Sequence, residues 1–307
     1  MLLTWASQTA FGKRALPCLA LLAFMVAASG SSLAQSNLAR VPGGSGAWLA
    51  PTPALTGDNP LALADPQGTA VLIFLPGSST EGRPDICRPL DSRLGTTPQA
   101  FQRLAGRTLA GKTLAVFGFC SETKLGSFRK DRYAGEPKVI GRKNDLRTLV
   151  EALRAAGLPA EQLFLAGHSA GGWAALLLQR DRPFEINAVL AFAPAFTGPR
   201  ATRTESWSRL RREMITRLSE AERLQALVVA VQGDPYNRPQ DLAFLAQIPG
   251  VRLIGLSSDE LEGRPCEAGS PHQLIYRDCF SDTQVDRIAA YLEQSLQGSD
   301  QRGPQNR

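Results

Sequence analysis

One stretch of this sequence, residues 163–176 (LFLAGHSAGGWAAL), restricts the possible folds more than any other. Its pattern predicts an apolar strand that leads into a glycine-flanked serine, Ser169, with an apolar helix directly after it. At so sharp a turn the serine adopts strained backbone angles, and Gly167 and Gly171 stand where side chains would collide with neighbouring backbone. The turn lifts the Ser169 hydroxyl out of the sheet, next to the positive end of the helix dipole. The helix N-terminus therefore faces any negative charge that develops beside Ser169.

Apolar runs alternate with helical patterns along the rest of the chain. Further strands are expected at 70–75, 114–119, 186–196, 227–231 and 251–256. Helices are expected around 98–109, 142–156, 207–218 and 241–248, and a last helix opens at the capping-box sequence 281–284 (SDTQ). This alternation predicts a mostly parallel sheet of about six to eight strands with helices on both faces. Residues 35–67, rich in Gly and Pro, predict an irregular wrap with one short hairpin.

The histidine content narrows the choice of a base. A serine hydroxyl is a poor nucleophile unless a base removes its proton, so Ser169 needs a histidine, and the chain has only two. His168 is adjacent to Ser169 on the turn, a position from which its ring points away from the hydroxyl. His272 lies between the last predicted strand and the last helix. We therefore expect His272 to be the general base that later returns the proton to the leaving group.

These features resemble the α/β-hydrolase family, in which the base lies on the loop before the last helix. The family places its acid after the strand that follows the serine-bearing strand by two. The resemblance implies Asp234, in the turn Gly233-Asp234-Pro235, as the acid that holds the base in its working tautomer. The family often spaces its Gly and Asp more widely, which leaves Asp241 open as an alternative. The order Ser169, Asp234, His272 is the family's order of nucleophile, acid and base.

An oxyanion formed at a carbonyl needs two preorganised N–H donors near Ser169. The backbone of Ala170 is expected to supply one. The resemblance places the other on the loop after strand 70–75, where Pro76-Gly77-Ser78 replaces the usual His-Gly. By position the second donor is the Ser78 N–H, with Gly77 permitting close approach.

The N-terminus has the pattern of a secretory signal. Lys13 and Arg14 precede an apolar run at 15–28, and Ser32-Leu33-Ala34 offers a small-residue cleavage site. A run of about 14 residues is short of the roughly 20 that a membrane span needs, although a membrane anchor is the alternative. We expect residues 1–34 to be a signal peptide, 35–297 a single hydrolase-like domain, and 298–307 a disordered tail. The expected location is periplasmic or secreted.

Export would leave four cysteines in an oxidising compartment, which permits two disulfides in any of three pairings. We favour Cys87 with Cys120 and Cys266 with Cys279, because the second pair closely flanks His272. Four free thiols are the alternative. Zinc is not expected, since no C-x-x-C or paired-histidine spacing occurs.

The formal net charge of +6 is mild, and no basic run is interleaved with aromatics, so nucleic acid is not an expected partner. Two segments, 122–143 and 200–217, are rich in basic residues and follow strand ends. They predict either a basic rim that favours anionic esters or ordinary solvated helix faces. Their basic residues are Lys124, Arg129, Lys130, Arg132, Lys138, Arg142, Lys143, Arg200, Arg203, Arg209, Arg211, Arg212 and Arg217.

These inferences favour a serine hydrolase of carboxylic esters that forms an acyl-enzyme on Ser169. A peptidase or a polyester depolymerase on the same residues is the alternative enzyme. A binding protein that keeps the fold without turnover is the alternative of another class. The short segment between Phe196 and Leu227 predicts only a small cap, open to bulky substrates. We expect a monomer that acts on a small-molecule, lipid or polyester ester, with no metal or organic cofactor and no stable membrane anchor after signal cleavage.

Overall fold

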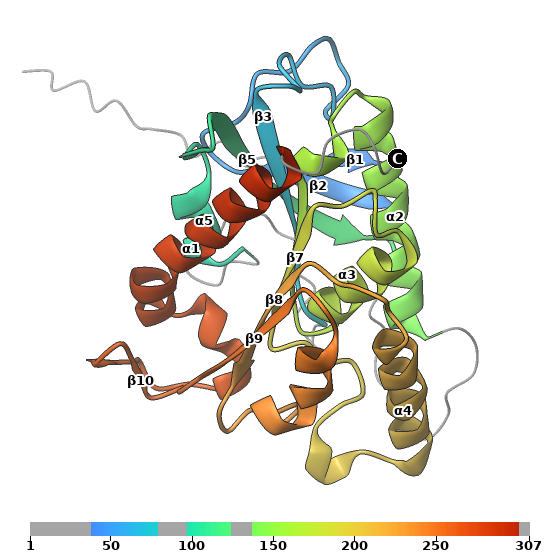
Figure 1. Ribbon diagram of the computed structural model, residues 1–307, viewed down its shortest axis with the longest axis vertical. Coiled ribbons are helices and arrows are strands. Elements are labelled where there is room, and N and C mark those ends of the chain that lie inside the picture. Colours follow the sequence, from blue (N-terminus) through green and yellow to red (C-terminus); the bar gives the residue numbers. More distant parts are fainter. Residues whose placement is uncertain (1–37, 79–96, 124–136, 301–307) are drawn as a thin grey trace, which may run out of the picture. The chain divides into compact units, whose positions relative to one another are not determined.

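The computed structural model describes residues 38–78, 97–123 and 137–300, with side chains as far as 298 (Figure 1). Six parallel strands form the centre of its main sheet, in the order β5-β3-β6-β7-β8-β9. They are β5 (Lys112–Ser121), β3 (Thr69–Leu75), β6 (Leu163–His168), β7 (Ala188–Phe192), β8 (Ala226–Val231) and β9 (Val251–Leu256). The mostly parallel sheet expected from the sequence is confirmed.

The strand order has a switch point between β3 and β6. From β3 the chain continues to β5 on one side, whereas from β6 it continues to β7 on the other. In open α/β sheets, ligands bind at the carboxyl ends of the strands where the connections diverge in this way. The loop 76–78 and Ser169 follow these two strands, so the predicted nucleophile lies at the expected crevice.

An N-terminal hairpin extends the sheet beyond β5. Its strands β1 (Ala39–Val41) and β2 (Gly44–Trp48) are antiparallel, and β2 pairs antiparallel with β5. The short β4 (Thr108–Leu109) also pairs with β5. The single hairpin predicted within 35–67 is thus present, and it lengthens the sheet instead of only wrapping around it.

Helices cover both faces of the sheet, as the alternation predicted. Alternate residues of β3 separate the two layers: Val71, Ile73 and Leu75 pack with one hydrophobic cluster, and Ala70, Leu72 and Phe74 with the other. The first layer holds α2 (Lys138–Ala155), α3 (Ala170–Asp181), α4 (Glu205–Ser219) and the 3₁₀ segment η3 (Pro239–Gln247). The second holds α1 (Gln99–Leu104) and α5 (Asp278–Asp300), which lie together in Figure 1. Outside the site, the remaining elements are two short 3₁₀ turns and a hairpin. They are η1 (Ala160–Gln162), η2 (Arg200–Thr202), and β10 (Glu260–Leu261) paired with β11 (Arg264–Pro265).

Two predicted element boundaries are wrong because of chain reversals that periodicity does not reveal. The helix expected at 98–109 ends at Leu104, and Leu109 belongs to β4. The strand expected at 186–196 ends at Phe192, because Ala193 adopts a left-handed φ of 42° and turns the chain.

The capping box predicted at 281–284 is also wrong, since α5 already begins at Asp278. Ser281 lies inside the helix, where its hydroxyl donates to the Arg277 carbonyl. The 3₁₀ segment η4 (Pro271–Tyr276) leads almost directly into α5, so the helix starts earlier than the local pattern indicates. At its other end α5 runs to Asp300, beyond the expected limit at Gln297.

No helix within the described ranges is both long and apolar enough to cross a membrane. The predicted signal peptide, residues 1–34, and residues 301–307 of the predicted tail lie outside those ranges.

Candidate active site

Ser169 occupies the sharp turn between β6 and α3 that the sequence predicts. Its backbone is strained, with φ 53° and ψ −120°. A Cβ on Gly167 would lie 2.3 Å from the carbonyl carbon of Gly171, and a Cβ on Gly171 would lie 2.0 Å from the carbonyl oxygen of Leu75. Both positions therefore require glycine, for the steric reason inferred from the sequence.

Ser169, His272 and Asp234 form a continuous hydrogen-bonded chain. His272 Nε2 lies 2.9 Å from Ser169 Oγ, and His272 Nδ1 lies 2.8 Å from Asp234 Oδ2. A carboxylate only accepts, so Nδ1 carries the proton and the bare Nε2 can accept the Ser169 hydroxyl proton. Asp234 is completely buried. The structure thus brings together the three residues that the sequence analysis selected, in a geometry that can move a proton from Ser169 to His272.

Asp241, the alternative acid, has other partners. Its Oδ2 accepts from the backbone N–H of Arg238 at 2.9 Å and lies 3.7 Å from Arg200 Nε. It therefore caps the start of η3, whereas Asp234 faces the imidazole.

The turn that carries Asp234 follows β8 and is anchored by its own backbone. Asp234 Oδ1 accepts the N–H groups of Tyr236 at 2.7 Å and Asn237 at 3.4 Å. The buried Asn237 side chain donates to the Pro194 carbonyl at 2.8 Å, and the Ala195 N–H donates to the Ser169 carbonyl at 3.1 Å. We call residues 233–237, which carry Asp234, the acid turn. These contacts join the acid turn to the serine turn through the segment after β7, which limits the relative movement of the two turns.

His168 is excluded as the base by its geometry. Its Nε2 lies 2.7 Å from the backbone carbonyl of His272, and its Nδ1 lies 3.5 Å from the Tyr276 hydroxyl. Burial, reinforced by the nearby His272, lowers the pKa of His168 to about 3, so the ring is neutral. Both ring nitrogens of His168 therefore contact the η4 segment, whereas the Ser169 hydroxyl contacts His272.

The two expected oxyanion donors belong to residues at or next to segments that contact the serine turn. Ala170 is the first residue of α3, whose N-terminal N–H groups have no partner within the helix. Gly77 lies so close to the turn that a Cβ there would be 2.9 Å from Ser169 Cβ and 2.8 Å from His168 Nδ1. Ser78, the other expected donor, is the next residue. Its role stays a prediction.

Comparisons with known proteins agree on the fold. Residues 142–253, which include Ser169 and Asp234, match the family model described as serine aminopeptidase, S33. The structure is similar to that of a peroxisomal α/β-hydrolase from Saccharomyces cerevisiae, with a TM-score of 0.52 and 13% identity over 82% of this chain and 88% of that one. It is also similar to a monoacylglycerol lipase from Paleococcus ferrophilus, with a TM-score of 0.51 and 14% identity over 81% of this chain and 98% of that one. This chain has the α/β-hydrolase fold. No curated protein sequence matches it.

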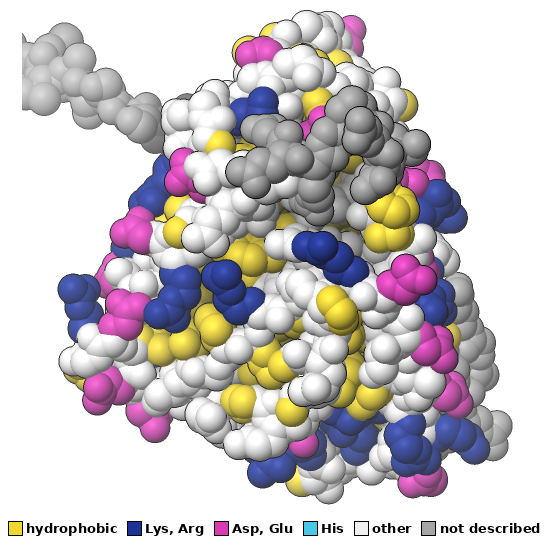
Figure 2. All heavy atoms as spheres, in the orientation of Figure 1, with side chains coloured by type: hydrophobic (Ala, Val, Ile, Leu, Met, Phe, Trp, Pro, Cys, Tyr) yellow, Lys and Arg dark blue, Asp and Glu magenta, His cyan; other side chains and the backbone are white. Residues whose placement is uncertain are grey.

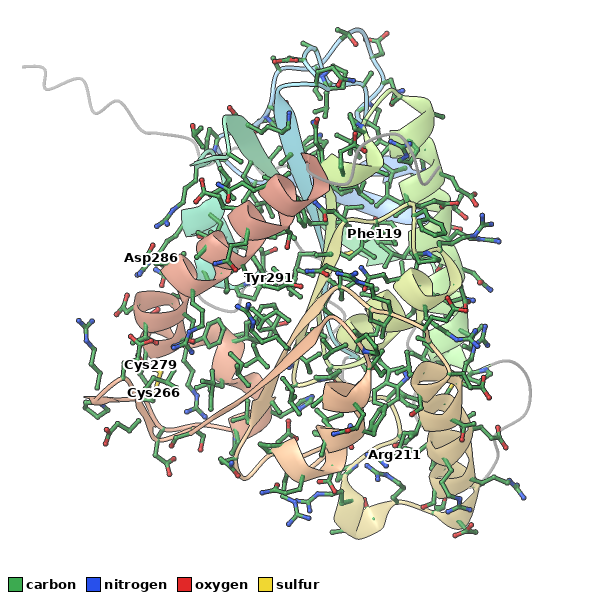
Figure 3. The ribbon with its side chains drawn as sticks, in the orientation of Figure 1. Phe119, Arg211, Cys266, Cys279, Asp286 and Tyr291 are labelled. Atoms are coloured by element: carbon green, nitrogen blue, oxygen red, sulfur yellow. A yellow bond between two sulfur atoms is a disulfide. The ribbon has the colours of Figure 1, made fainter. Side chains whose placement is uncertain are left out.

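A disulfide in this α/β-hydrolase fold encloses the segment that carries His272. Cys266 and Cys279 are bonded, with their Cα atoms 5.3 Å apart. Cys266 directly follows β11 and Cys279 lies in the first turn of α5, as the labels in Figure 3 show. This pairing was predicted and is confirmed. Cys87 lies outside the described residues, so its pairing with Cys120 stays a prediction.

Several arginines of segment 200–217, for which the sequence left a basic rim and a solvated helix face open, donate to backbone carbonyls around the turn that carries Asp234. Arg200 donates to the Asp234 carbonyl at 3.2 Å, and Arg203 donates to the Tyr236 carbonyl at 3.0 Å. Arg211 of α4 reaches the Asp241 carbonyl at 2.8 Å, on the side of α4 that faces η3 (Figure 3). Desolvation, together with neighbouring arginines, lowers the pKa of Arg203. These three residues are structural, a role that spacing alone does not reveal.

The remaining charges of α4 are exposed or paired. Arg212 contacts Glu205 at 2.7 Å and Arg217 contacts Asp181 at 3.0 Å. Figure 2 shows acidic and basic side chains interspersed where α4 lies, which fits a solvated helix face. In the other segment Arg142 is 2% exposed and Lys143 9%, so neither belongs to a rim. Lys124, Arg129, Lys130 and Arg132 lie outside the described residues.

Within the described ranges, no three His, Cys, Asp or Glu side chains are grouped so that they could hold a metal ion.

Proposed function

We propose that this α/β-hydrolase is a serine esterase that cleaves carboxylic esters in the periplasm or outside the cell. The observation that carries the proposal is the hydrogen-bonded chain from Asp234 through His272 to Ser169, with the serine on a strained turn at the switch point of the sheet. Such a chain activates a hydroxyl that is otherwise a weak nucleophile.

In the proposed reaction, Ser169 Oγ attacks the ester carbonyl carbon while His272 Nε2 accepts the hydroxyl proton. The carbonyl electron pair moves onto oxygen, where the N–H groups of Ala170 and Ser78 stabilise the negative charge. When the C–O bond of the ester breaks, His272 returns the proton to the departing alkoxide. Water then attacks the acyl-enzyme by the same route, with His272 as base, and releases the acid and free Ser169.

The buried Asp234 stabilises the imidazolium that forms in both steps and keeps Nδ1 protonated. Because its Oδ1 is occupied by backbone N–H groups, Oδ2 is directed to the imidazole. The arginines that donate to the carbonyls of the acid turn support this orientation.

Two observations bear on the substrate. The similarity to a monoacylglycerol lipase is in keeping with an ester substrate. The match of residues 142–253 to a family described as serine aminopeptidase supports a peptidase as the second candidate. Both reactions would use the same proton transfers, so substrate assays must separate them.

The test combines labelling with turnover. The purified protein and its Ser169→Ala variant are treated with a fluorophosphonate probe and assayed on a 4-nitrophenyl ester and on aminoacyl 4-nitroanilides. We expect labelling and ester turnover that both disappear in the variant. Faster turnover of a nitroanilide would favour the peptidase, and absence of labelling in the unmodified protein would favour a non-catalytic binding protein.

The disulfide supports the proposed location, since such bonds persist mainly in oxidising compartments.

A further inference from the structure

Arg142, on α2, is an unusual charged residue because it lies in the interior next to the serine turn. Its exposed fraction is 2%, and its guanidinium donates to two backbone carbonyls, those of Pro76 and Gly77. Burial lowers the pKa of Arg142 to about 10. A buried arginine is rarely found without a structural or functional demand, because the charge loses its hydration.

The contacts of Arg142 distinguish it from the neighbouring cation on the same helix. Lys143 forms an ion pair with Asp181 at 2.6 Å. Asp145, the nearest acidic residue of α2, instead accepts from the Thr123 N–H at 2.8 Å and from the Ser121 hydroxyl. The hydrogen bonds of Arg142 thus go to the loop after β3 and not to a carboxylate.

The planarity of the peptide bond connects these contacts to the site. The Gly77 carbonyl and the Ser78 N–H belong to one trans peptide unit, so they point in opposite directions. A donor that holds the carbonyl on one side thereby directs the Ser78 N–H to the other side. The same holds for the Pro76 carbonyl and the Gly77 N–H.

Gly77 explains why such a restraint is needed. A side chain at this position would collide with Ser169 and His168, so glycine is required. Glycine also leaves the following peptide unit free to rotate, because it lacks the steric limits of other residues. An oxyanion donor must be oriented before the reaction to be effective.

We propose that Arg142 is a positioning residue that holds the peptide units of Pro76-Gly77-Ser78 with the Ser78 N–H directed at the oxyanion. The inference rests on the proposed esterase function and extends it to a residue that does not touch the substrate.

The experiment compares three variants of the full protein: Arg142→Met, Arg142→Lys and Lys143→Met. Steady-state kinetics on a 4-nitrophenyl ester are combined with inhibition by an alkyl boronic acid, which forms a tetrahedral adduct on the serine. Loss of one oxyanion donor costs about 10²–10³ in kcat. For Arg142→Met, a misdirected donor should therefore lower kcat roughly 10–100-fold, leave KM within about threefold, and weaken boronate binding in proportion to kcat/KM.

Arg142→Lys should recover part of kcat, since an ammonium can still donate to a carbonyl. Lys143→Met, which removes a buried cation from the same helix without touching the loop, should retain kcat. If Arg142→Met does not fold, as judged by circular dichroism, Arg142→Lys must still show the kcat loss without a KM change.

Equal kcat in either folded Arg142 variant and the unmodified protein would overturn the positioning role while leaving the esterase proposal intact. Boronate affinity that stays constant while kcat falls would also overturn it. An unmodified protein that neither hydrolyses esters nor reacts with fluorophosphonate would overturn both proposals.

Discussion

His168 Nε2 lies 2.7 Å from the backbone carbonyl oxygen of His272, so the residue next to the nucleophile holds the backbone of the proposed base. A carbonyl can only accept, which means that Nε2 of His168 carries the proton and its Nδ1 is bare. The Tyr276 hydroxyl lies 3.5 Å from that bare nitrogen. The serine turn and the η4 segment are therefore connected independently of the bond between His272 and Ser169.

Replacing His168 should reduce activity through the position of His272. His168→Ala leaves the His272 carbonyl buried without its donor, at a cost of about 1–3 kcal/mol, and should lower kcat. His168→Gln can donate from its amide to the same carbonyl and should recover part of both stability and kcat. Urea denaturation and ester kinetics measure the two effects. Full activity in a folded His168→Ala would show that this contact does not position the base.

The buried His168 should make the fold sensitive to acid. Its folded pKa of about 3 lies below the ordinary value of 6.5, so the unfolded state binds the proton more readily between these pH values. The stabilising effect of the neutral ring is complete above about pH 6.5 and is lost toward pH 3, by at most roughly 1.4 kcal/mol per pH unit. Denaturation at pH 7 and pH 4.5 should show a smaller acid-induced loss in His168→Gln than in the unmodified protein. Identical losses would contradict this assignment.

The choice between the two acids can be tested with matched variants. Asp234→Asn should lower kcat by about 10⁴, because the amide no longer holds His272 in the working tautomer. Asp241→Asn, which affects the cap of η3, should stay within severalfold of normal kcat and lose some stability. Single-turnover acylation with a 4-nitrophenyl ester gives both rates. The reverse ranking would transfer the acid role to Asp241.

The Cys266–Cys279 disulfide should stabilise the segment that carries His272. With a sequence separation of 13, the chain-entropy estimate for the closed loop is about 3 kcal/mol. A Cys266→Ser, Cys279→Ser double variant should lose stability of that order in guanidinium denaturation and should lower kcat at temperatures where the segment opens. An unchanged denaturation midpoint would exclude this role.

The N-terminal pattern predicts cleavage after Ala34. Expression of the full chain in a bacterium with a periplasm should yield a protein whose N-terminus is Gln35, read by mass spectrometry of the periplasmic fraction. A membrane-bound protein that retains residues 1–34 would instead support the anchor alternative.

Short-range features of the site were predictable because their causes lie within a few residues. Gly167 and Gly171 are required by the backbone around Ser169, two positions away on either side. The apolar runs that form β3, β6 and β8 predicted strands, and all the residues of these three strands are buried. The two histidines left only His272 as a base once the turn was recognised.

Arg142 and the capping-box residue Ser281 show where such prediction ends. Both fit local patterns, one an amphipathic helix and the other a helix start, yet their surroundings come from distant segments. Arg142 donates to the carbonyls of Pro76 and Gly77, which lie 66 and 65 positions away in the sequence. No local pattern could therefore indicate that it is buried. Ser281 is inside a helix because α5 begins earlier, beside η4 and the disulfide.

By itself, then, the sequence determined the serine turn and the alternation of strands and helices, since these depend on backbone sterics and hydrophobic periodicity within one element. It also left His272 as the proposed base, because the chain has only two histidines. Only the tertiary structure decided that Asp234 and not Asp241 faces His272, and that Arg200, Arg203 and Arg142 donate to backbone carbonyls. The physical reason is the reach of long polar side chains. Their hydrogen-bond partners are set by which loops the sheet brings together, and no local pattern records that arrangement.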